Sequence, residues 1–191
     1  PHDPYGLMKS MGGKDMYIAR LDTLFEEKYY WHGNEPCHQV AYLYNYVGQP
    51  WKTQKYTRHI MDTEYGDMPG GLAGNDDAGQ MSAWYIFSAM GFYPVCPGSD
   101  QYVLGAPYMP YIKLDLSNGK SLVIKAEGVS DRNRYVKALY MNGKKYDKTY
   151  VTHEDILAGG EWEFVMDAKP NKKRGVSADA KPYSLTELEI K

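Results

Sequence analysis

Apolar residues recur at helical spacing in the first half of the chain, in stretches bounded by Gly and Pro. This pattern predicts amphipathic helices over residues 16–25, 36–47, 50–61 and 79–90. Their apolar positions are Met16, Ala19, Leu21, Leu24 and Phe25; Val40, Leu43, Tyr44 and Val47; Trp51, Tyr56, Ile60 and Met61; and Met81, Trp84 and Tyr85. Asn34 is expected to cap the second helix, and Gly48 and Gly91 are expected to end the second and fourth.

Beyond residue 97 the pattern changes to short runs in which apolar and polar positions mostly alternate, which predicts β-strands. The runs cover residues 102–104, 112–116, 122–126, 136–141, 162–166 and 185–190. Asn118-Gly119 and Asn142-Gly143 are dipeptides typical of type I′ hairpin turns, so antiparallel pairing is expected.

The predicted fold class is therefore α+β, with a helical segment at residues 1–97 and an antiparallel β-sandwich or curled sheet at 98–191. The break between them falls in the proline-rich stretch 94–97. Four one-faced helices do not close a core alone, so their apolar side must meet the sheet, another part of a longer chain or another molecule.

The composition is that of an ordinary globular protein: 43% of the 191 residues are hydrophobic and 24% are charged. The net charge of -2 gives no basic surface for nucleic acid, and no apolar run is long enough to span a membrane. The one basic run, residues 169–174, is interpreted as a solvated loop. Cys37 and Cys96 fit no metal-binding spacing and are expected to be free thiols.

Tyrosine is unusually frequent, with 19 residues against four phenylalanines, and four tryptophans accompany it. Such rings combine an apolar face with a polar edge, which suits stacking on sugars. Most of them must nevertheless serve packing.

Two loops carry polar groups immediately before predicted helices: residues 31–38 and 70–82. Asp76 and Asp77 at the start of the fourth helix are consistent with helix capping. The neighbouring glycines and Asn75 equally suit a ligand site, since glycine lets the backbone approach a ligand. Both interpretations stay open at this point.

The first of these loops gathers Trp31, His32, Asn34 and Glu35 in a polar-aromatic cluster. Its oxygen ligands would suit calcium rather than zinc. His38 is interpreted as a structural residue of the second helix.

Several ordered motifs resemble glycoside hydrolase family 92, strongly up to about residue 110. They are residues 1–4 (PHDP), 33–36 (GNEP), 42–45 (YLYN), 48–54 (GQPWKTQ), 71–85 (GLAGNDDAGQMSAWY) and 90–95 (MGFYPV). The resemblance implies a secreted, bacterial, calcium-dependent exo-α-mannosidase, of α-1,2 specificity, acting on mannose-rich glycans with inversion. It also implies that the helices are the last ones of an (α/α)6 toroid.

The resemblance further implies site residues. Asp76 or Asp77 would supply the general base, without a choice between them. Trp31, His32, Asn34 and Glu35 would contact the sugar, and Asn34, Glu35 and Asp77 would hold calcium. The general acid would be a glutamate in a motif that precedes the PHDP segment in the family and is absent here, so this chain alone is expected to be inactive.

The mannosidase interpretation therefore requires two partners, a mannose-containing glycan and an N-terminal part of a parent enzyme, in the periplasm or outside the cell. The alternatives are a non-catalytic carbohydrate-binding module and a purely structural C-terminal lobe. A binding module would hold a glycan without cleaving it, and a structural lobe would bind none.

Overall fold

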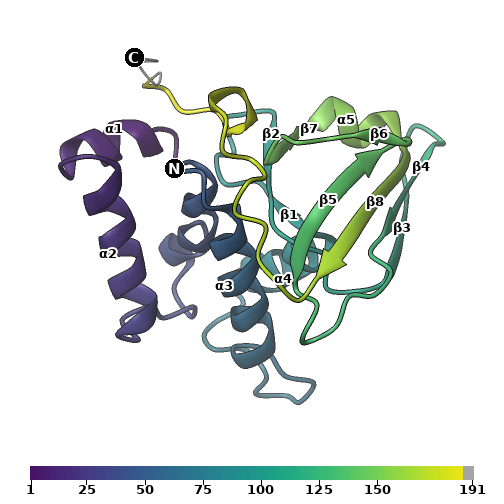
Figure 1. The fold of residues 1–191 in the computed structure, drawn as a ribbon. Helices are drawn as coiled ribbons and strands as arrows, with labels where there is room; N and C mark the ends of the chain where they lie inside the picture. Colours follow the sequence, from purple (N-terminus) through teal and green to yellow (C-terminus); the bar gives the residue numbers. More distant parts are fainter. Residues whose placement is uncertain (187–191) are drawn as a thin grey trace.

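The computed structural model describes residues 1–186 and confirms an α+β architecture, helices first and sheets second (Figure 1). The α-helices are α1 (Pro4–Ser10), α2 (Lys14–Glu26), α3 (Pro50–Thr63), α4 (Gln80–Met90) and α5 (His153–Ala158). Short 3-10 helices are η1 (Glu35–Cys37), η2 (Val40–Asn45) and η3 (Ala178–Ala180). The strands are β1 (Phe92–Tyr93), β2 (Gln101–Leu104), β3 (Tyr111–Asp115), β4 (Ser121–Lys125), β5 (Tyr135–Met141), β6 (Lys144–Lys145), β7 (Tyr150–Thr152) and β8 (Gly160–Asp167).

The helix predicted from Pro36 is wrong: this stretch forms η1 and η2 instead. Two carbonyls that an α-helix would use internally accept side-chain bonds here. Trp84 Nε1 donates to the His38 carbonyl at 2.8 Å, and Thr53 Oγ1 donates to that of Ala41 at 2.8 Å. Residues 41–47 are all buried, so the segment has no solvent face to set a helical period.

The predictions for the other helices differ in detail. The third and fourth predicted helices are confirmed as α3 and α4, and α4 ends at Gly91 in a left-handed conformation. In α2 the buried positions are Tyr17 and Leu21, whereas Met16 is 49% exposed. Asp3 accepts a hydrogen bond from Gly6 N and caps α1, an element that the apolar pattern did not reveal.

The strands form a three-stranded sheet, β1-β2-β7, and a five-stranded sheet, β3-β4-β8-β5-β6. Pairing is antiparallel except that β4 and β8 run parallel, with Leu122 opposite Gly160. The expectation of uniformly antiparallel strands is therefore wrong at this pair. The short helix α5 also lies beyond the predicted end of helical structure, while the final predicted strand falls mostly in residues 187–191, outside the described residues.

Both Asn-Gly dipeptides lie in hairpin turns, as predicted. Asn142 and Gly143 have φ of 50° and 75°, as a type I′ turn requires. In the other turn only Gly119 has positive φ, and its N–H donates to the Leu116 carbonyl, which is the pattern of a type I turn followed by a left-handed glycine.

Two hydrophobic clusters share the interior. One joins α2, η2, α3 and α4 through buried tyrosines and Trp84, and the other fills the space between the sheets around Trp162 and Phe164. In Figure 1, α3 stands between α2 and the five-stranded sheet, and it contacts β5 and η2. Residues 168–180, which we call the crossing segment, run from β8 across the front of the molecule beside α3. The predicted boundary near residue 97 stays a prediction.

Two further expectations concern the described residues. Cys37 and Cys96 are free thiols, as expected. Within residues 1–186, each helix is too short or too polar to cross a bilayer.

Candidate functional site

The two predicted site loops touch each other through glycine backbones. A Cβ added at Gly74 would lie 2.5 Å from the Gly33 carbonyl oxygen, and one at Gly33 would lie 2.7 Å from that of Ala73. Neither position accepts a larger residue without movement of a backbone, because these separations are shorter than van der Waals contact. The sequence thus uses glycine to bring the Glu35 loop against the loop of the two aspartates.

Asp76 lies just before α4 and uses one carboxylate oxygen as a cap. Its Oδ1 accepts from Ser82 N at 2.9 Å and from Ser82 Oγ at 2.8 Å. The N-cap residue of α4 is Gly79, but Asp76 satisfies a free N–H in the first turn as a cap does, and its second oxygen carries no protein hydrogen bond in the described chain. Capping by one oxygen leaves the other available for chemistry.

Asp77 is exposed and lies in a left-handed turn. Its φ is 48° and that of Ala78 is 57°, a rare conformation for residues with a Cβ. Gly79 follows with φ of 97°. Two successive left-handed residues other than glycine, Asp77 and Ala78, are strained, and such strain occurs more often at functional loops than elsewhere.

Glu35 holds the one feature of the first loop that calls for a ligand. Its Oε1 is buried and has no hydrogen-bond partner among the described residues. A buried carboxylate oxygen without a partner costs free energy, so a bound group is its natural complement. Asn34 and Trp31 are exposed, and Trp31 is 58% accessible, as a sugar-contacting residue would be.

His32 is placed differently from the prediction. It is fully buried, its Nδ1 lies 2.7 Å from Tyr30 Oη and its Nε2 lies 2.7 Å from Tyr65 Oη. The ring packs between His38, at 4.5 Å between centroids, and Trp84, at 4.3 Å. A direct contact between His32 and a sugar does not fit this burial, so we regard it as a residue that fixes the loop.

The hydrogen-bond network also sets the charge of His32. Tyr65 Oη donates to the Met81 carbonyl at 2.9 Å, so it accepts from His32 Nε2, and His32 Nδ1 then accepts from Tyr30 Oη. Burial, assisted by the neighbouring His38, lowers the pKa of His32 to about 3. The ring is therefore neutral at ordinary pH. His38 is likewise buried and structural, as expected, with its Nε2 on the His32 carbonyl at 3.1 Å.

A pocket adjoins the second of these loops, and Leu72 and Ser82 of that loop line it. It has a volume of about 580 Å³ and is lined by residues of α3, the α3–α4 loop, α4 and the segment after β2. The lining includes Tyr65, Tyr85, Tyr108, Asp62 and Ser82, and Ser82 also binds Asp76. The sequence motifs included Ser82 and Tyr85, whereas Asp62, Tyr65 and Tyr108 were not predicted; the abundance of tyrosine was the only signal for the two tyrosines.

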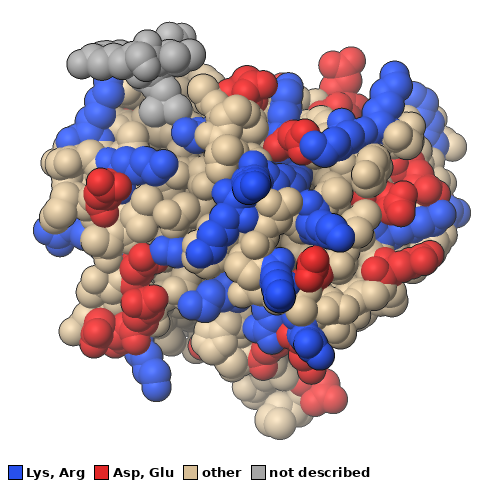
Figure 2. Space-filling model, in the orientation of Figure 1, with Lys and Arg blue, Asp and Glu red and all other residues tan. Residues whose placement is uncertain are grey.

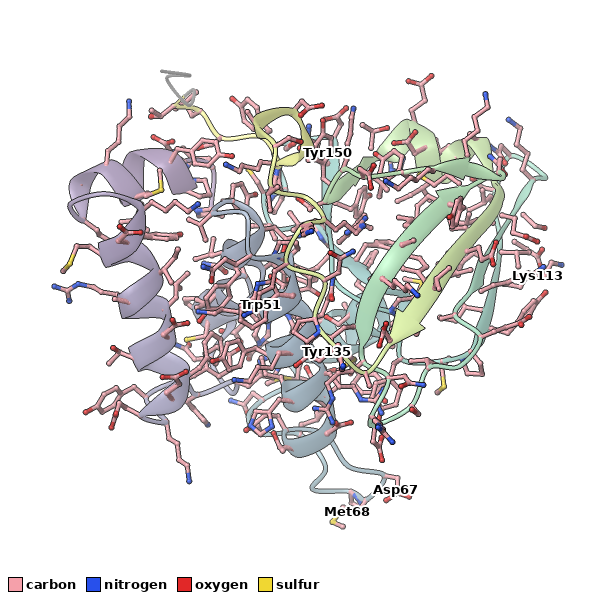
Figure 3. All side chains as sticks on the ribbon, viewed as in Figure 1. Trp51, Asp67, Met68, Lys113, Tyr135 and Tyr150 are labelled. Carbon is pink, nitrogen blue, oxygen red and sulfur yellow. The ribbon has the colours of Figure 1, made fainter. Side chains whose placement is uncertain are left out.

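The Asp67 side chain also lines this pocket, and Figure 3 shows Asp67 and Met68 at the tip of the α3–α4 loop. Of the predicted site residues, Asp76, Asp77 and Glu35 are not among the lining. We predict that the carboxylates of Asp76, Asp77 and Glu35 nevertheless face one common cavity.

Calcium fits the donors only in part. Glu35 offers an unpaired buried oxygen, and Asn34 and Asp77 offer exposed amide and carboxylate oxygens of the kind calcium prefers. Among residues 1–186, however, no three His, Cys, Asp or Glu side chains cluster closely enough to hold an ion. Because calcium takes six to eight ligands, backbone carbonyls, waters or other parts of a longer chain would have to complete the shell.

Comparison with known proteins identifies relatives. Residues 1–168 match the glycosyl hydrolase family 92 catalytic domain. The fold superimposes on the family GH92 α-mannosidase BT3965 from Bacteroides thetaiotaomicron with a TM-score of 0.94 and 50% identity, over 99% of this chain and 26% of that one. It also matches the inverting mannosidase BT2199 of that organism, with a TM-score of 0.90 and 39% identity, over 96% of this chain and 28% of the other.

A curated relative, an uncharacterized secreted glycosidase from Arthroderma benhamiae, is 30% identical over 97% of this chain and 24% of its own length. The chain thus spans about a quarter of the relatives it matches. The match of a catalytic-domain model to most of the sequence, together with close superposition on two mannosidases of the family, establishes that the chain belongs to glycosyl hydrolase family 92.

Proposed function

We propose that this chain works as the C-terminal part of a longer inverting exo-α-mannosidase that hydrolyses α-mannosidic bonds in mannose-rich glycans, with α-1,2-linked mannose as the expected substrate. The observation that supports it is the close contact of Gly33 with Gly74, which holds the Glu35 loop against the Asp76-Asp77 loop. One structural relative, BT3965, was solved with mannoimidazole, which is consistent with a mannose-shaped site in the family.

Inversion at a sugar carbon needs two carboxyl groups with different tasks. One donates a proton to the leaving oxygen, and the other removes a proton from water on the opposite face, about 6.5–9.5 Å away. Asp76 and Asp77 are adjacent and serve one loop, so the pair supplies the base alone. The acid must come from elsewhere, and by the family resemblance it would be a glutamate in a motif that this sequence does not include.

The roles of general base and supporting residue can be assigned to the two aspartates in two ways. Asp76 keeps one oxygen on Ser82, which would orient the other toward water, whereas Asp77 is exposed and free to bind a metal. A carboxylate near a cation or accepting hydrogen bonds stays ionised, as a base requires. In the reverse assignment, Asp77 takes the proton and Asp76 holds the loop.

Calcium is part of this proposal, with Asn34, Glu35 and Asp77 as its ligands in this chain. When bound, it would grip sugar hydroxyls and offset negative charge in the site. Glu35 and Asp77 would hold the ion between the two loops, and Trp31 would offer its exposed face to the sugar ring.

The proposed location is the periplasm or the cell exterior. The secreted relative from Arthroderma benhamiae supports secretion of the whole protein.

The test compares mannose release from an α-1,2-mannobioside by this chain alone and by the longer mannosidase that contains it. We expect no turnover from the chain alone, because general acid catalysis contributes about 10²–10⁴-fold. In the longer enzyme, replacement of the base by Asn should abolish turnover without loss of folding. The other Asp should lose less activity, and Asp179→Asn, an exposed aspartate far along the chain in η3, should lose none.

Three outcomes would contradict the proposal. Turnover by the chain alone at the rate of the longer enzyme would show that no external acid is needed. Near-normal activity in both Asp76→Asn and Asp77→Asn would return the loop to a purely structural role. Glycan binding without any cleavage, by chain and longer protein alike, would instead identify a carbohydrate-binding module.

A further inference from the structure

A second pocket lies beside the crossing segment, and its lining is mainly cationic, whereas the two site loops carry carboxylates. It has a volume of about 310 Å³ and is bounded by β5, β6 and residues 171–177. Four cationic side chains line it: Lys137, Lys145, Lys173 and Arg174. Figure 2 shows Lys and Arg side chains gathered at the centre of this face, over the crossing segment.

The pocket contains one acidic side chain, and that side chain is already paired. Asp147 lies 2.7 Å from Lys145 Nζ. Lys137 and Lys173 are exposed and have no ion pair among the described residues. The lining therefore carries a surplus of positive charge, which attracts anions.

Arg174 is the unusual member, because it is buried and forms no salt bridge among the described residues, although the charge of Asp147 acts on it. One terminal nitrogen donates to the Lys148 carbonyl at 2.9 Å and lies 3.4 Å from that of Tyr146. Its Nε is buried without a partner. A buried guanidinium is costly unless it is paired, so its charge favours an anion in the adjoining pocket.

The backbone holds Arg174 in this position. The next residue, Gly175, has φ of 68°, and a Cβ there would overlap the Thr149 methyl group and lie 3.3 Å from Pro50. Thr149 Oγ1 in turn donates to the Ala180 carbonyl at 2.8 Å, and Asn171 Nδ2 donates to that of Lys137 at 2.8 Å. The crossing segment is thus fastened on both sides of the arginine, so the pocket is a built feature.

We propose that this pocket binds a phosphate group, held by Arg174, Lys137 and Lys173. Guanidinium and ammonium groups bind phosphate through short charge-assisted hydrogen bonds, and arginine does so in a fixed planar geometry. A dianion matches the surplus of cations better than a single carboxylate does. The group could be free inorganic phosphate or the monoester of a sugar phosphate, and both present the same oxygens.

The experiment is isothermal titration calorimetry of the protein with inorganic phosphate, mannose 6-phosphate and mannose. We expect both phosphates to bind and mannose not to bind at this site. Lys137→Gln with Lys173→Gln should weaken phosphate binding at least about tenfold, the loss of two charge-assisted contacts. Both lysines are exposed, so this variant retains the fold.

The matched control removes the same number of positive charges from the basic run 169–174, at positions away from the pocket. Lys169→Gln with Lys172→Gln serves, because neither residue lines the cavity and Lys172 Nζ lies 5.0 Å from the Trp51 ring. Figure 3 labels Trp51 near the middle of this face. The control should bind phosphate within about twofold of the parent protein, since only long-range attraction is lost.

Each outcome decides the matter. Tighter binding of mannose 6-phosphate than of phosphate identifies a sugar phosphate as the ligand, and equal binding identifies the phosphate group alone. Absence of phosphate binding, or equal weakening in the pocket variant and the control, overturns the proposal. Arg174→Lys is a further variant: it keeps a charge but loses the planar donors, and it should bind phosphate more weakly than the parent.

Discussion

At the scale of single residues, the interior of this protein carries polar groups whose protonation is fixed by neighbours. His32 donates to Tyr65, accepts from Tyr30 and packs on His38 and Trp84, so its ring is neutral and immobile. Placing a charge on it would put an ion in a site without solvent or a counter-charge. The cluster thereby ties the Glu35 loop to α4.

This burial predicts a loss of stability in acid. The folded pKa of His32 is about 3, below its unfolded value of about 6.5, so unfolding takes up a proton between these pH values. The contribution is complete above about pH 6.5 and declines as pH falls toward 3. Burial also lowers the pKa of His38, which adds in the same direction.

Urea unfolding at pH 7 and at pH 4.5 measures the effect. The His32→Gln variant should have a pH slope smaller by about 1.4 kcal/mol per pH unit, the value for one proton. His59→Gln, which changes an exposed histidine on α3, is the control and should keep the slope of the parent. Parallel curves for His32→Gln and the parent would show that His32 is not a buried neutral ring.

At the scale of elements, α4 begins and ends on left-handed glycines with different surroundings. Gly79 has φ of 97° and open space around its Cβ position. Gly91 has φ of 94°, and a Cβ there would lie 2.9 Å from the nitrogen and Cδ of Pro107. A side chain at Gly79 would therefore cause backbone strain alone, whereas one at Gly91 would cause both backbone strain and a steric clash.

Substitution by alanine should cost different amounts at the two ends. Gly79→Ala pays only for the left-handed conformation, about 1 kcal/mol of unfolding free energy. Gly91→Ala must also displace the Pro107 backbone, so we expect about 3 kcal/mol. Urea titration of both variants gives the comparison. Equal losses would mean that the segment around Pro107 moves freely, contrary to the packing described here.

Local sequence predicted the elements whose signals are local. Pro50, Gly91 and the Asn-Gly turns each act within a few residues, and α3, α4 and the hairpins were predicted. The stretch after Pro36 could not be predicted, since Trp84 and Thr53 decide its carbonyl bonding from 46 and 12 residues away. The helix α5 did carry a local signal, because Thr152 and Asp155 have the spacing of a capping box, and they form one in the structure.

The site divides in the same way. Motif resemblance pointed to the two loops and to Glu35, whose unpaired oxygen the structure then revealed. It implied a sugar contact for His32, which the structure instead buries, because burial depends on the packing of distant rings. The pocket beside the loops combines Tyr65, Tyr85 and Tyr108 from three segments, and no spacing in the sequence encodes that meeting.

At the scale of the whole molecule, two buried side chains connect the helical half to the sheets. Asn45 Nδ2 donates to the carbonyls of Leu104 at 2.8 Å and Thr149 at 3.0 Å. Gln54 Oε1 on α3 accepts from Val136 N of β5 at 3.0 Å. Unfolding of either half would therefore leave polar groups of the other half without their hydrogen-bond partners.

We predict one calorimetric transition in which both halves unfold together, with calorimetric and van't Hoff enthalpies equal. Asn45→Ala should lower the stability of that transition by about 3 kcal/mol, through lost hydrogen bonds and an internal void. The exposed Asn75→Ala is the control and should change it by less than about 0.5 kcal/mol. Two separated transitions in the parent protein would contradict this coupling.

The tyrosines buried between these elements have an optical consequence. Burial raises the pKa of Tyr17, Tyr42, Tyr46 and Tyr65, so their phenols resist ionisation while the core is intact. Tyr29, by contrast, lies at the surface. As the pH is raised, the ultraviolet absorbance of tyrosinate should therefore increase in two stages. The first is a gradual rise from surface phenolates, and the second is an abrupt rise when the core unfolds. Tyrosinate absorbance therefore reports on the core directly, and its abrupt rise marks the unfolding of the protein.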